Sequence, residues 1–343
     1  MHTTEASELY GGADLHGNNV FLALKDAQGK TVFKRRVKAN LEAVNGAMSP
    51  FWPRLQSLAV EATFNWYWFV DGLREEKRPV ILANPAKMEQ YEGLKQTDDS
   101  TDAEWLAEQV RLGIVPECYV YPKAVRPIRD LLRRRALIVR QRTQSLLSLE
   151  SLLSRYGLSA PGVDKLKQWT SDDVQELGLD EFSQLQAQTL RVLMQKQSEL
   201  IETVEKAVLK KVKPSAEFER IQQVPGIGKI LGMVILLESG EFNRFASAGN
   251  YASYCRAVKS LRSSNGKKKG ENNRKNGNPY LAWAYIEAAT FAARYSARTQ
   301  AWYERKKNRR NVAVAKKALA CKLAKAVWHV MKGNNFDERM LFG

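Results

Sequence analysis

The sequence predicts three regions in order: an α+β N-terminal domain, a helical coiled-coil hairpin, and a mostly α-helical C-terminal domain. Short apolar runs bounded by turn residues predict strands in the first third of the chain. Long stretches with apolar residues three and four apart predict helices in the middle. Cations interleaved with aromatic residues predict a folded, basic domain at the end. We place these domains at residues 1–125, 126–215 and 216–343.

The N-terminal region begins with three apolar runs separated by turns, which predict an antiparallel meander. These runs cover residues 9–15, 20–24 and 31–37. The following segments predict a helix at 41–55, a strand at 58–63, a helix at 65–75, a strand at 80–83 and a helix beginning near Asp102. This order is that of an RNase H-like fold, although other α+β domains share the same periodicity.

The middle region contains two long helical stretches, at residues 127–156 and about 180–211, separated by a break at 157–161. In the second stretch, residues spaced by threes and fours are Phe182, Leu185, Thr189, Val192, Lys196, Leu200, Val204 and Ala207. Together the two stretches predict an antiparallel coiled-coil hairpin. Such a hairpin serves either as an intramolecular packing unit or as a dimer contact, and the spacing favours neither.

The composition excludes several classes of protein. Apolar residues make up 44% of the chain and charged residues 27%, which excludes a mainly disordered chain. No apolar run reaches the roughly 18 residues of a membrane span, and the start lacks a secretory signal, so we expect a cytoplasmic protein with no membrane partner. Three distant cysteines, Cys118, Cys255 and Cys321, argue against a disulfide framework, and three histidines leave few candidates for a zinc site.

The net charge of the chain is +17, and most of it lies in the last quarter. Residues 256–343 contain 21 Lys or Arg and 5 Asp or Glu, a balance of +16. A domain this basic is expected to bind polyanions. Because aromatic residues lie among the cations, a folded nucleic-acid-binding domain is favoured over a disordered basic tail.

Four carboxylates follow the ends of predicted elements. Asp14 ends the first strand, Glu61 ends the fourth, and Asp99 and Asp102 open the helix that comes next. In an RNase H-like sheet the first and fourth strands are neighbours, so Asp14 and Glu61 are expected side by side. Asp99 and Asp102 are three residues apart and share a helix face, which favours Asp99 over its neighbour Asp98.

Clustered carboxylates are suited to Mg²⁺, which prefers hard oxygen ligands and takes others from substrate phosphates. Two such ions can stabilise the attacking and leaving oxygens of a phosphoryl transfer. The aspartates have a structural alternative as helix caps or turn residues. Glu61 is the most diagnostic of the set, because an unpaired carboxylate within an apolar strand is costly.

Several motifs together resemble a known enzyme family. They are ADLHG, VEAT and TDDSTDA in the first part of the chain, then VPGIGKILG, and finally SSNGKKKGENNRKNGNPYLAWAYIEAA. The ordered series resembles the DEDD-type insertion-sequence transposases related to the Piv invertase, which are bridge-RNA-guided DNA recombinases. The resemblance spans nearly the whole chain.

The resemblance implies roles for each region. It implies a RuvC-like domain in which Asp14, Glu61, Asp99 and Asp102 bind metal, a coiled coil that joins protomers, and a C-terminal transposase domain. It also implies that a serine ahead of the Gly-Lys segment attacks DNA, which Ser264 fits. Ser263 and, more remotely, Ser260 are the alternatives. Composite sites in a tetramer and a noncoding guide RNA that pairs with target and donor DNA are implied as well.

The segment from Lys259 to Asn278 is expected to be a loop that contacts nucleic acid. Its candidate phosphate-binding cations are Lys259, Arg262, Lys267, Lys268, Lys269, Arg274 and Lys275. The glycines at 224–232 are typical of a helix-hairpin-helix turn, which binds phosphate or simply joins two helices. The two interpretations have equal support in the sequence.

The preferred function is therefore a prokaryotic transposase or site-specific recombinase that acts with Mg²⁺ through a covalent serine-DNA intermediate, associated with the nucleoid when active. One alternative is a RuvC-like nuclease or junction resolvase in which water attacks. Another is a protein that binds nucleic acid without catalysis. Free DNA ends with no protein attached distinguish the nuclease, and binding without Mg²⁺-dependent cleavage distinguishes the last.

Overall fold

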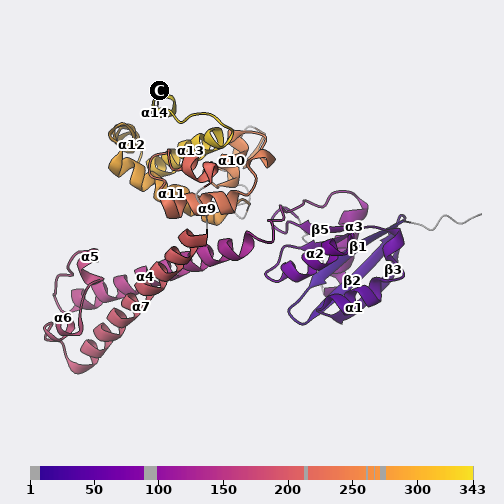
Figure 1. Ribbon diagram of the computed structural model, residues 1–343, viewed down its shortest axis with the longest axis horizontal. Helices are drawn as coiled ribbons and strands as arrows, with labels where there is room; N and C mark the ends of the chain where they lie inside the picture. Colours follow the sequence, from indigo (N-terminus) through magenta and orange to yellow (C-terminus); the bar gives the residue numbers. More distant parts are fainter. Residues whose placement is uncertain are drawn as a thin grey trace, which may run out of the picture. The chain divides into compact units, whose positions relative to one another are not determined.

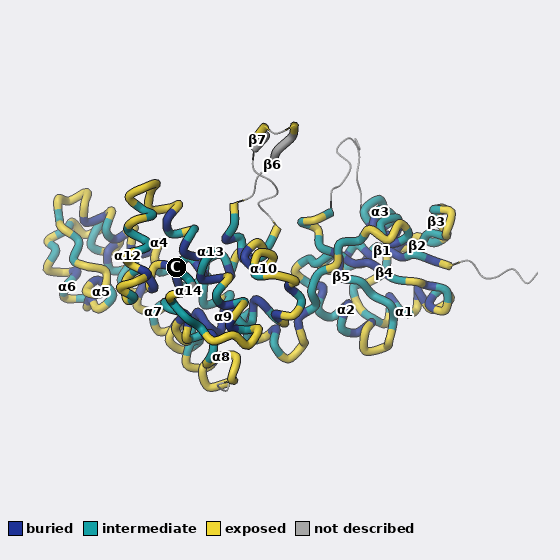
Figure 2. Tube along the Cα trace, turned by 90° about the horizontal axis from the view of Figure 1, so that it is seen from above, coloured by how far each residue is buried: buried dark blue, intermediate teal, exposed yellow. Residues whose placement is uncertain are grey.

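The computed structural model describes residues 8–88, 99–211, 215–259, 262–265, 267–270 and 276–342. The chain divides into two compact units, the first built on residues up to Lys123 and the second on residues from Ala124 (Figure 1). Each unit has its own buried core, seen as dark segments in Figure 2. Ser260, Arg274 and Lys275, together with Asp98, lie outside the described residues.

The first unit contains a five-stranded mixed sheet. Its elements are β1 (Leu9–Leu15), β2 (Asn19–Asp26), β3 (Thr31–Lys38), α1 (Leu41–Met48), β4 (Leu55–Glu61), α2 (Trp66–Glu75), β5 (Val80–Ala83) and α3 (Asp99–Arg111). The strand order is β3-β2-β1-β4-β5, with β1 to β3 antiparallel and β4 parallel to both β1 and β5. The predicted meander and the order of the elements are confirmed, and the arrangement is consistent with an RNase H-like fold.

One predicted helix is shorter than expected. The segment predicted as a helix over 41–55 ends at Met48, and a single 3-10 turn, η1 (Trp52–Arg54), follows it. Pro50 explains the early end, because proline lacks the amide hydrogen that a continuing helix would need at that position.

Each face of the sheet has its own layer of helices. One face packs on a large apolar core that includes Val44 of α1 and Phe69 of α2. The other face packs on α3, where Ala59 of β4 and Ala83 of β5 meet Leu106 and Val110. Small residues on this second face allow α3 to lie close to the strands.

The second unit begins with two long helices, α4 (Arg126–Arg155) and α7 (Glu181–Lys211), which lie side by side (Figure 1). The short helices α5 (Val163–Leu166) and α6 (Ser171–Gln175) close the end of this hairpin over a small apolar cluster with Trp169. The hairpin is therefore present, while coiled-coil packing between the two helices stays a prediction.

The stripe of α7 from which the hairpin was predicted is not the buried one. In α7, the residues that are buried recur every seven positions: Ala187, Met194, Ile201 and Val208. By contrast, Phe182 is 80% exposed and Leu185 64% exposed. The helix has two apolar stripes on different sides, because at 100° per residue these two sets lie more than a quarter turn apart.

The remaining elements form a helical domain around one core. They are α8 (Ala216–Ile221), α9 (Lys229–Ser239), η2 (Phe242–Arg244), α10 (Ala248–Tyr254), β6 (Arg262–Ser264), β7 (Lys267–Gly270), α11 (Pro279–Tyr295), α12 (Ala297–Arg309), α13 (Val312–Met331) and α14 (Glu338–Phe342). Helices α9, α10, α11 and α13 supply most of the core. The mostly helical character of this region is confirmed.

The segment predicted as a loop over 259–278 contains an antiparallel strand pair. Strands β6 and β7 pair with Ser264 opposite Lys267, so only two residues separate them. Asn265 in the turn has a φ of +53°, a left-handed value that asparagine tolerates well. Asn-Gly is a strong hairpin signal, and the absence of apolar residues in the flanking strands explains why the loop was predicted instead.

Candidate active site

The sheet places Asp14 and Glu61 at the same end of neighbouring strands. In the parallel pair of β1 and β4, Ala13 lies opposite Val60, and the two acids are the next residues of each strand. Because side chains alternate along a strand, Asp14 shares a face with Gly12, and Glu61 shares a face with Ala59. That face is the one covered by α3.

Gly12 allows α3 to approach β1 closely. A Cβ atom at Gly12 would lie 2.0 Å from the carbonyl oxygen of Ala103 and 2.6 Å from the amide nitrogen of Ala107. No residue other than glycine fits this contact without moving the helix. The close approach holds Asp102, which directly precedes Ala103, next to the end of the strand that contains Asp14.

The electrostatics of Glu61 show that three of the predicted acids are neighbours. Burial raises the pKa of the Glu61 carboxyl above its ordinary value, and the negative charges of Asp14 and Asp102 raise it further. Asp14 and Asp102 therefore lie near enough to Glu61 for their charges to act on it. The backbone of Asp99 starts α3, while its side chain lies outside what the structure describes.

Two residues that the sequence analysis did not select support Asp14. His16 Nε2 lies 2.9 Å from Asp14 Oδ2, and the Asn65 side chain donates a hydrogen bond to the backbone carbonyl of His16 at 2.8 Å. Thr63 Oγ1 donates to the Asn65 side-chain oxygen, and the Thr63 amide donates to the Glu61 carbonyl. These bonds tie the loop after β4 to the end of β1.

The acids suit a divalent cation by their chemistry. All three are oxygen donors, and burial together with the charges of Asp14 and Asp102 raises the pKa of the Glu61 carboxyl. Within the described residues, no group of three or more His, Cys, Asp or Glu side chains is close enough to form a complete metal site. The side chain of Asp99, a predicted ligand, is outside that set.

The predicted nucleophile lies on the other unit. Ser264 is the last residue of β6 and Ser263 precedes it, and the structure describes the backbone of both but not their side chains. The same holds for Arg262, Lys268 and Lys269. Lys259 and Lys267, two of the predicted phosphate-binding cations, are exposed.

The glycine-rich turn at 224–232 has a packing role. Gly226 has a φ of +80°, and a Cβ at this position would lie 2.1 Å from the carbonyl oxygen of Ala288 in α11. The turn between α8 and α9 therefore rests directly on the backbone of α11. This contact explains one glycine of the motif without a ligand, and phosphate binding by the turn stays a prediction.

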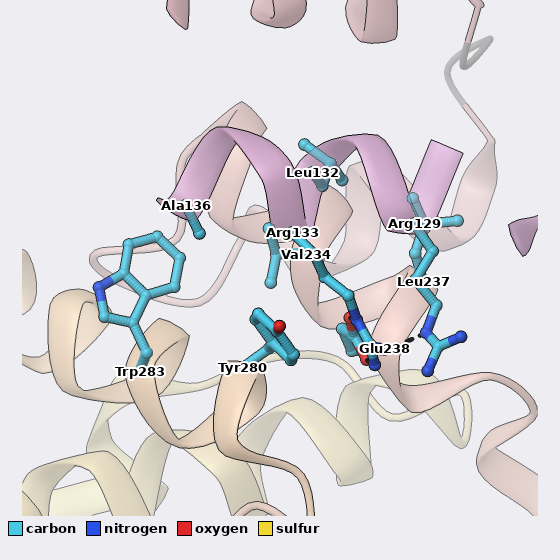
Figure 3. Close-up of a pocket in the computed structure, with 9 residues that line it drawn as sticks. All are labelled: Arg129, Leu132, Arg133, Ala136, Val234, Leu237, Glu238, Tyr280 and Trp283. Atoms are coloured by element: carbon cyan, nitrogen blue, oxygen red, sulfur yellow. Dashed lines mark hydrogen bonds and ion pairs between the residues drawn. The ribbon is translucent and has the colours of Figure 1, made fainter. Parts of the chain in front are cut away.

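A buried ion cluster joins α4, α9 and the start of α11 (Figure 3). It lies at the C-terminal end of residues 259–278, the segment that contains β6 and β7 and is called the strand-pair segment below. The Glu238 carboxylate accepts from Arg129 Nε at 3.1 Å, Arg133 Nε at 2.5 Å and Asn278 Nδ2 at 2.7 Å. Arg133 also lies over the ring of Tyr280, 4.4 Å from its centroid. Burial opposes ionisation of Glu238, but these partners outweigh it and lower the pKa of the carboxyl.

No helix among the described residues is both long enough and apolar enough to cross a membrane.

Comparisons with known proteins match both parts of the chain. A transposase family model of the IS110 DEDD type matches residues 12–158, and the model of the transposase IS116/IS110/IS902 family matches residues 218–304. The chain is also 26% identical over 285 residues to a probable family 20 transposase of Pseudomonas aeruginosa strain PAO1. That alignment covers 80% of this chain and 83% of the relative. The first model covers all four predicted acids, and the second covers Ser264.

Proposed function

We propose that this chain, an IS110-family transposase, cuts and rejoins the DNA of a mobile element through a covalent ester between Ser264 and DNA. The observation that carries the proposal is the placement of Asp14 and Glu61 at the same end of neighbouring strands, with Asp102 near enough for its charge to act on Glu61. Transposases of this type act on DNA by strand cleavage and transfer, and the DEDD pattern indicates a divalent metal.

The acids would hold Mg²⁺ through the carboxylates of Asp14, Glu61 and Asp102, with Asp99 as the fourth ligand. Bound Mg²⁺ supplies positive charge that favours phosphodiester chemistry. His16 and Asn65 fix the position of Asp14 through the contacts described above. Burial and the charges of Asp14 and Asp102 raise the pKa of Glu61, so a bound cation would favour the ionised form of this carboxyl.

Ser264 would supply the nucleophile. Its hydroxyl oxygen forms a bond to a DNA phosphorus, the hydroxyl proton leaves, and the bond between the phosphorus and a 3′ oxygen breaks. The 3′ oxygen takes up a proton and leaves as a hydroxyl, and one phosphoester replaces another. Because the energy of the ester is retained, a 3′ hydroxyl of another strand can attack it and restore a continuous DNA strand.

Two partners belong to the proposal. A noncoding guide RNA would select the donor and target DNA by base pairing, while the protein holds the nucleic-acid backbones. The chain would act as a homo-oligomer, a dimer or a tetramer. The exposed apolar stripe of α7 that begins at Phe182 and Leu185 supports a protomer contact through the helical hairpin.

The nucleophile is tested by replacing Ser264 with alanine. The Ser264→Ala protein is expected to bind DNA normally and to form no DNA adduct that survives denaturing electrophoresis. Ser263→Ala is the matched control and retains the adduct. Adducts formed equally by both variants would remove Ser264 from the mechanism, and free ends without any adduct in the unsubstituted protein would establish the nuclease alternative.

The metal role is tested separately with Glu61→Gln, which keeps the shape of the side chain. Cleavage should be lost in this variant at any Mg²⁺ concentration, while DNA affinity is unchanged. Full cleavage by Glu61→Gln would show that the carboxylate cluster is not the catalytic centre.

A further inference from the structure

A dense group of cations lies where α12 meets α13. Between residues 305 and 317 the chain has no acid, and it contains the cations Arg305, Lys306, Lys307, Arg309, Arg310, Lys316 and Lys317. We call these seven residues the basic corner. They come after residues 218–304, the part of the C-terminal region that the family model matches, and they are separate from the cations of the strand-pair segment.

Ion pairing does not explain the basic corner. Lys307 pairs with Glu304 at 2.6 Å. Of the residues that the structure describes, no acid pairs with the other six cations. Arg305, Arg309 and Arg310 are exposed, as is Lys317, so their charges face water.

Helix electrostatics explain only part of the group. Lys306, Lys307 and Arg309 occupy the last turn of α12, where the helix dipole favours cations. Arg310, however, directly precedes Asn311, the N-cap of α13, where the dipole disfavours a positive charge. The mutual repulsion of the corner is therefore not balanced by its own helices.

Packing does not explain the group either. The buried face of α13 is apolar and begins with Ala315 and Leu319. Thr299 and Ser296 at the other end of α12 bond to Glu338 of α14, which fixes α12 without any use of the corner. Within the part of the chain that the structure describes, the six cations other than Lys307 are thus placed by α12 and α13 without a structural ion pair.

We propose that the basic corner is a binding surface for the phosphate backbone of duplex DNA. The charge complementarity is specific to a dense polyanion, because duplex DNA carries about one negative charge per 1.7 Å of its axis. Choosing DNA as the polyanion rests on the proposed function. The binding surface itself rests on the unbalanced cations, and it would bind DNA of any sequence.

The test uses the full chain and a fluorescent mixed-sequence DNA duplex of about 40 base pairs, with affinity measured by anisotropy from about 50 to 200 mM NaCl. The variant replaces Arg305, Arg309 and Arg310 with glutamine. The slope of log affinity against log salt is expected to fall in magnitude by about 2 to 3, because each lost phosphate contact removes about 0.9. Affinity at the lowest salt should fall at least about tenfold.

The matched control replaces Lys206, Lys210 and Lys211, three exposed lysines of α7, with glutamine, which removes the same net charge. Its slope should equal that of the unsubstituted protein. Equal losses in the two triple variants would overturn the proposal, because binding would then follow net charge rather than the corner. A larger loss for single-stranded RNA of the same length than for the duplex would overturn DNA as the ligand.

The outcome is separable from that of the proposed function. Ser264→Ala should leave the salt slope unchanged and abolish the adduct. The corner variant should still form the adduct when its concentration is raised well above its increased dissociation constant for DNA. A corner variant with an unchanged slope would refute the surface even when the adduct confirms Ser264.

Discussion

Replacing Gly12 with alanine should displace α3 and disable the acid cluster. The new Cβ would lie 2.0 Å from the Ala103 carbonyl oxygen, whereas ordinary contact begins at 3.4 Å, so the helix must recede by 1.4 Å, the difference between the two. Overpacking of a core typically costs about 1–3 kcal/mol, and we expect about 3 kcal/mol because the obstacle is backbone and cannot rotate away.

The assay is calorimetric unfolding of the full chain together with Mg²⁺-dependent DNA cleavage. Gly12→Ala should lower the unfolding temperature of the first unit. It should also reduce cleavage, because Asp102 moves with α3. Gly46→Ala is the control: no atom lies within 4 Å of the added Cβ, and alanine within α1 should stabilise by about 0.5–1 kcal/mol. If Gly12→Ala unfolds and cleaves like the unsubstituted protein, the packing of α3 does not position the acids as inferred.

Three further predictions follow from the charges and the exposed surfaces. The pKa of Glu61 is raised in the folded protein, so its contribution to the free energy of unfolding is present at low pH and is lost as pH rises through the folded pKa. Without metal, the free energy of unfolding of Glu61→Gln should not show this decrease when it is measured across pH. The pKa of Glu238 is lowered, so its contribution to stability is present above the ordinary carboxyl pKa and is lost on acidification. Glu238→Ala should lower the free energy of unfolding in urea by about 3–5 kcal/mol, and a decrease below about 1 kcal/mol would contradict the buried cluster. Phe182→Asp should reduce the mass seen by light scattering without changing the melting temperature, whereas Met194→Asp, at a buried site of α7, should unfold the hairpin; an unchanged mass for Phe182→Asp would exclude this stripe as a protomer contact.

The sheet and the neighbourhood of its acids were predictable from the sequence for a physical reason. Alternating apolar runs and turn residues locate strands, and the order of strands and helices places the first strand beside the fourth. Asp14 and Glu61 therefore meet without any knowledge of side-chain contacts. The support from His16 and Asn65 was not predictable, because it depends on how the loop after β4 returns to β1.

Glu238 shows the limit of reasoning from burial alone. It stands in the apolar run of α9 much as Glu61 stands in β4, and both patterns indicate a carboxylate that needs a partner. The partners of Glu238 are Arg129 and Arg133, more than a hundred residues earlier, and no local pattern connects them. The same signal thus marks a structural ion cluster in one unit and a candidate catalytic acid in the other.

The stripe of α7 illustrates a different limit. A helix with apolar residues on two sides gives two sets of spacings, and the sequence does not say which set faces its partner. The set with larger side chains, from Phe182 to Leu200, indicated the coiled-coil hairpin in the sequence and is exposed in the structure. The smaller Ala187 is fully buried, which allows α7 to lie close to α4.

The Glu238 cluster also fixes one end of the helical hairpin to the rest of the second unit. Helix α4 is about 45 Å long at 1.5 Å per residue. Arg129 and Arg133 in its first turns bond to Glu238, which also accepts a hydrogen bond from Asn278, the residue that caps α11. Asn278, that cap, stands at the end of the segment that contains the strand pair. The same cluster that fixes the start of α4 thus also fixes the position where the segment with Ser264, the proposed nucleophile, joins α11.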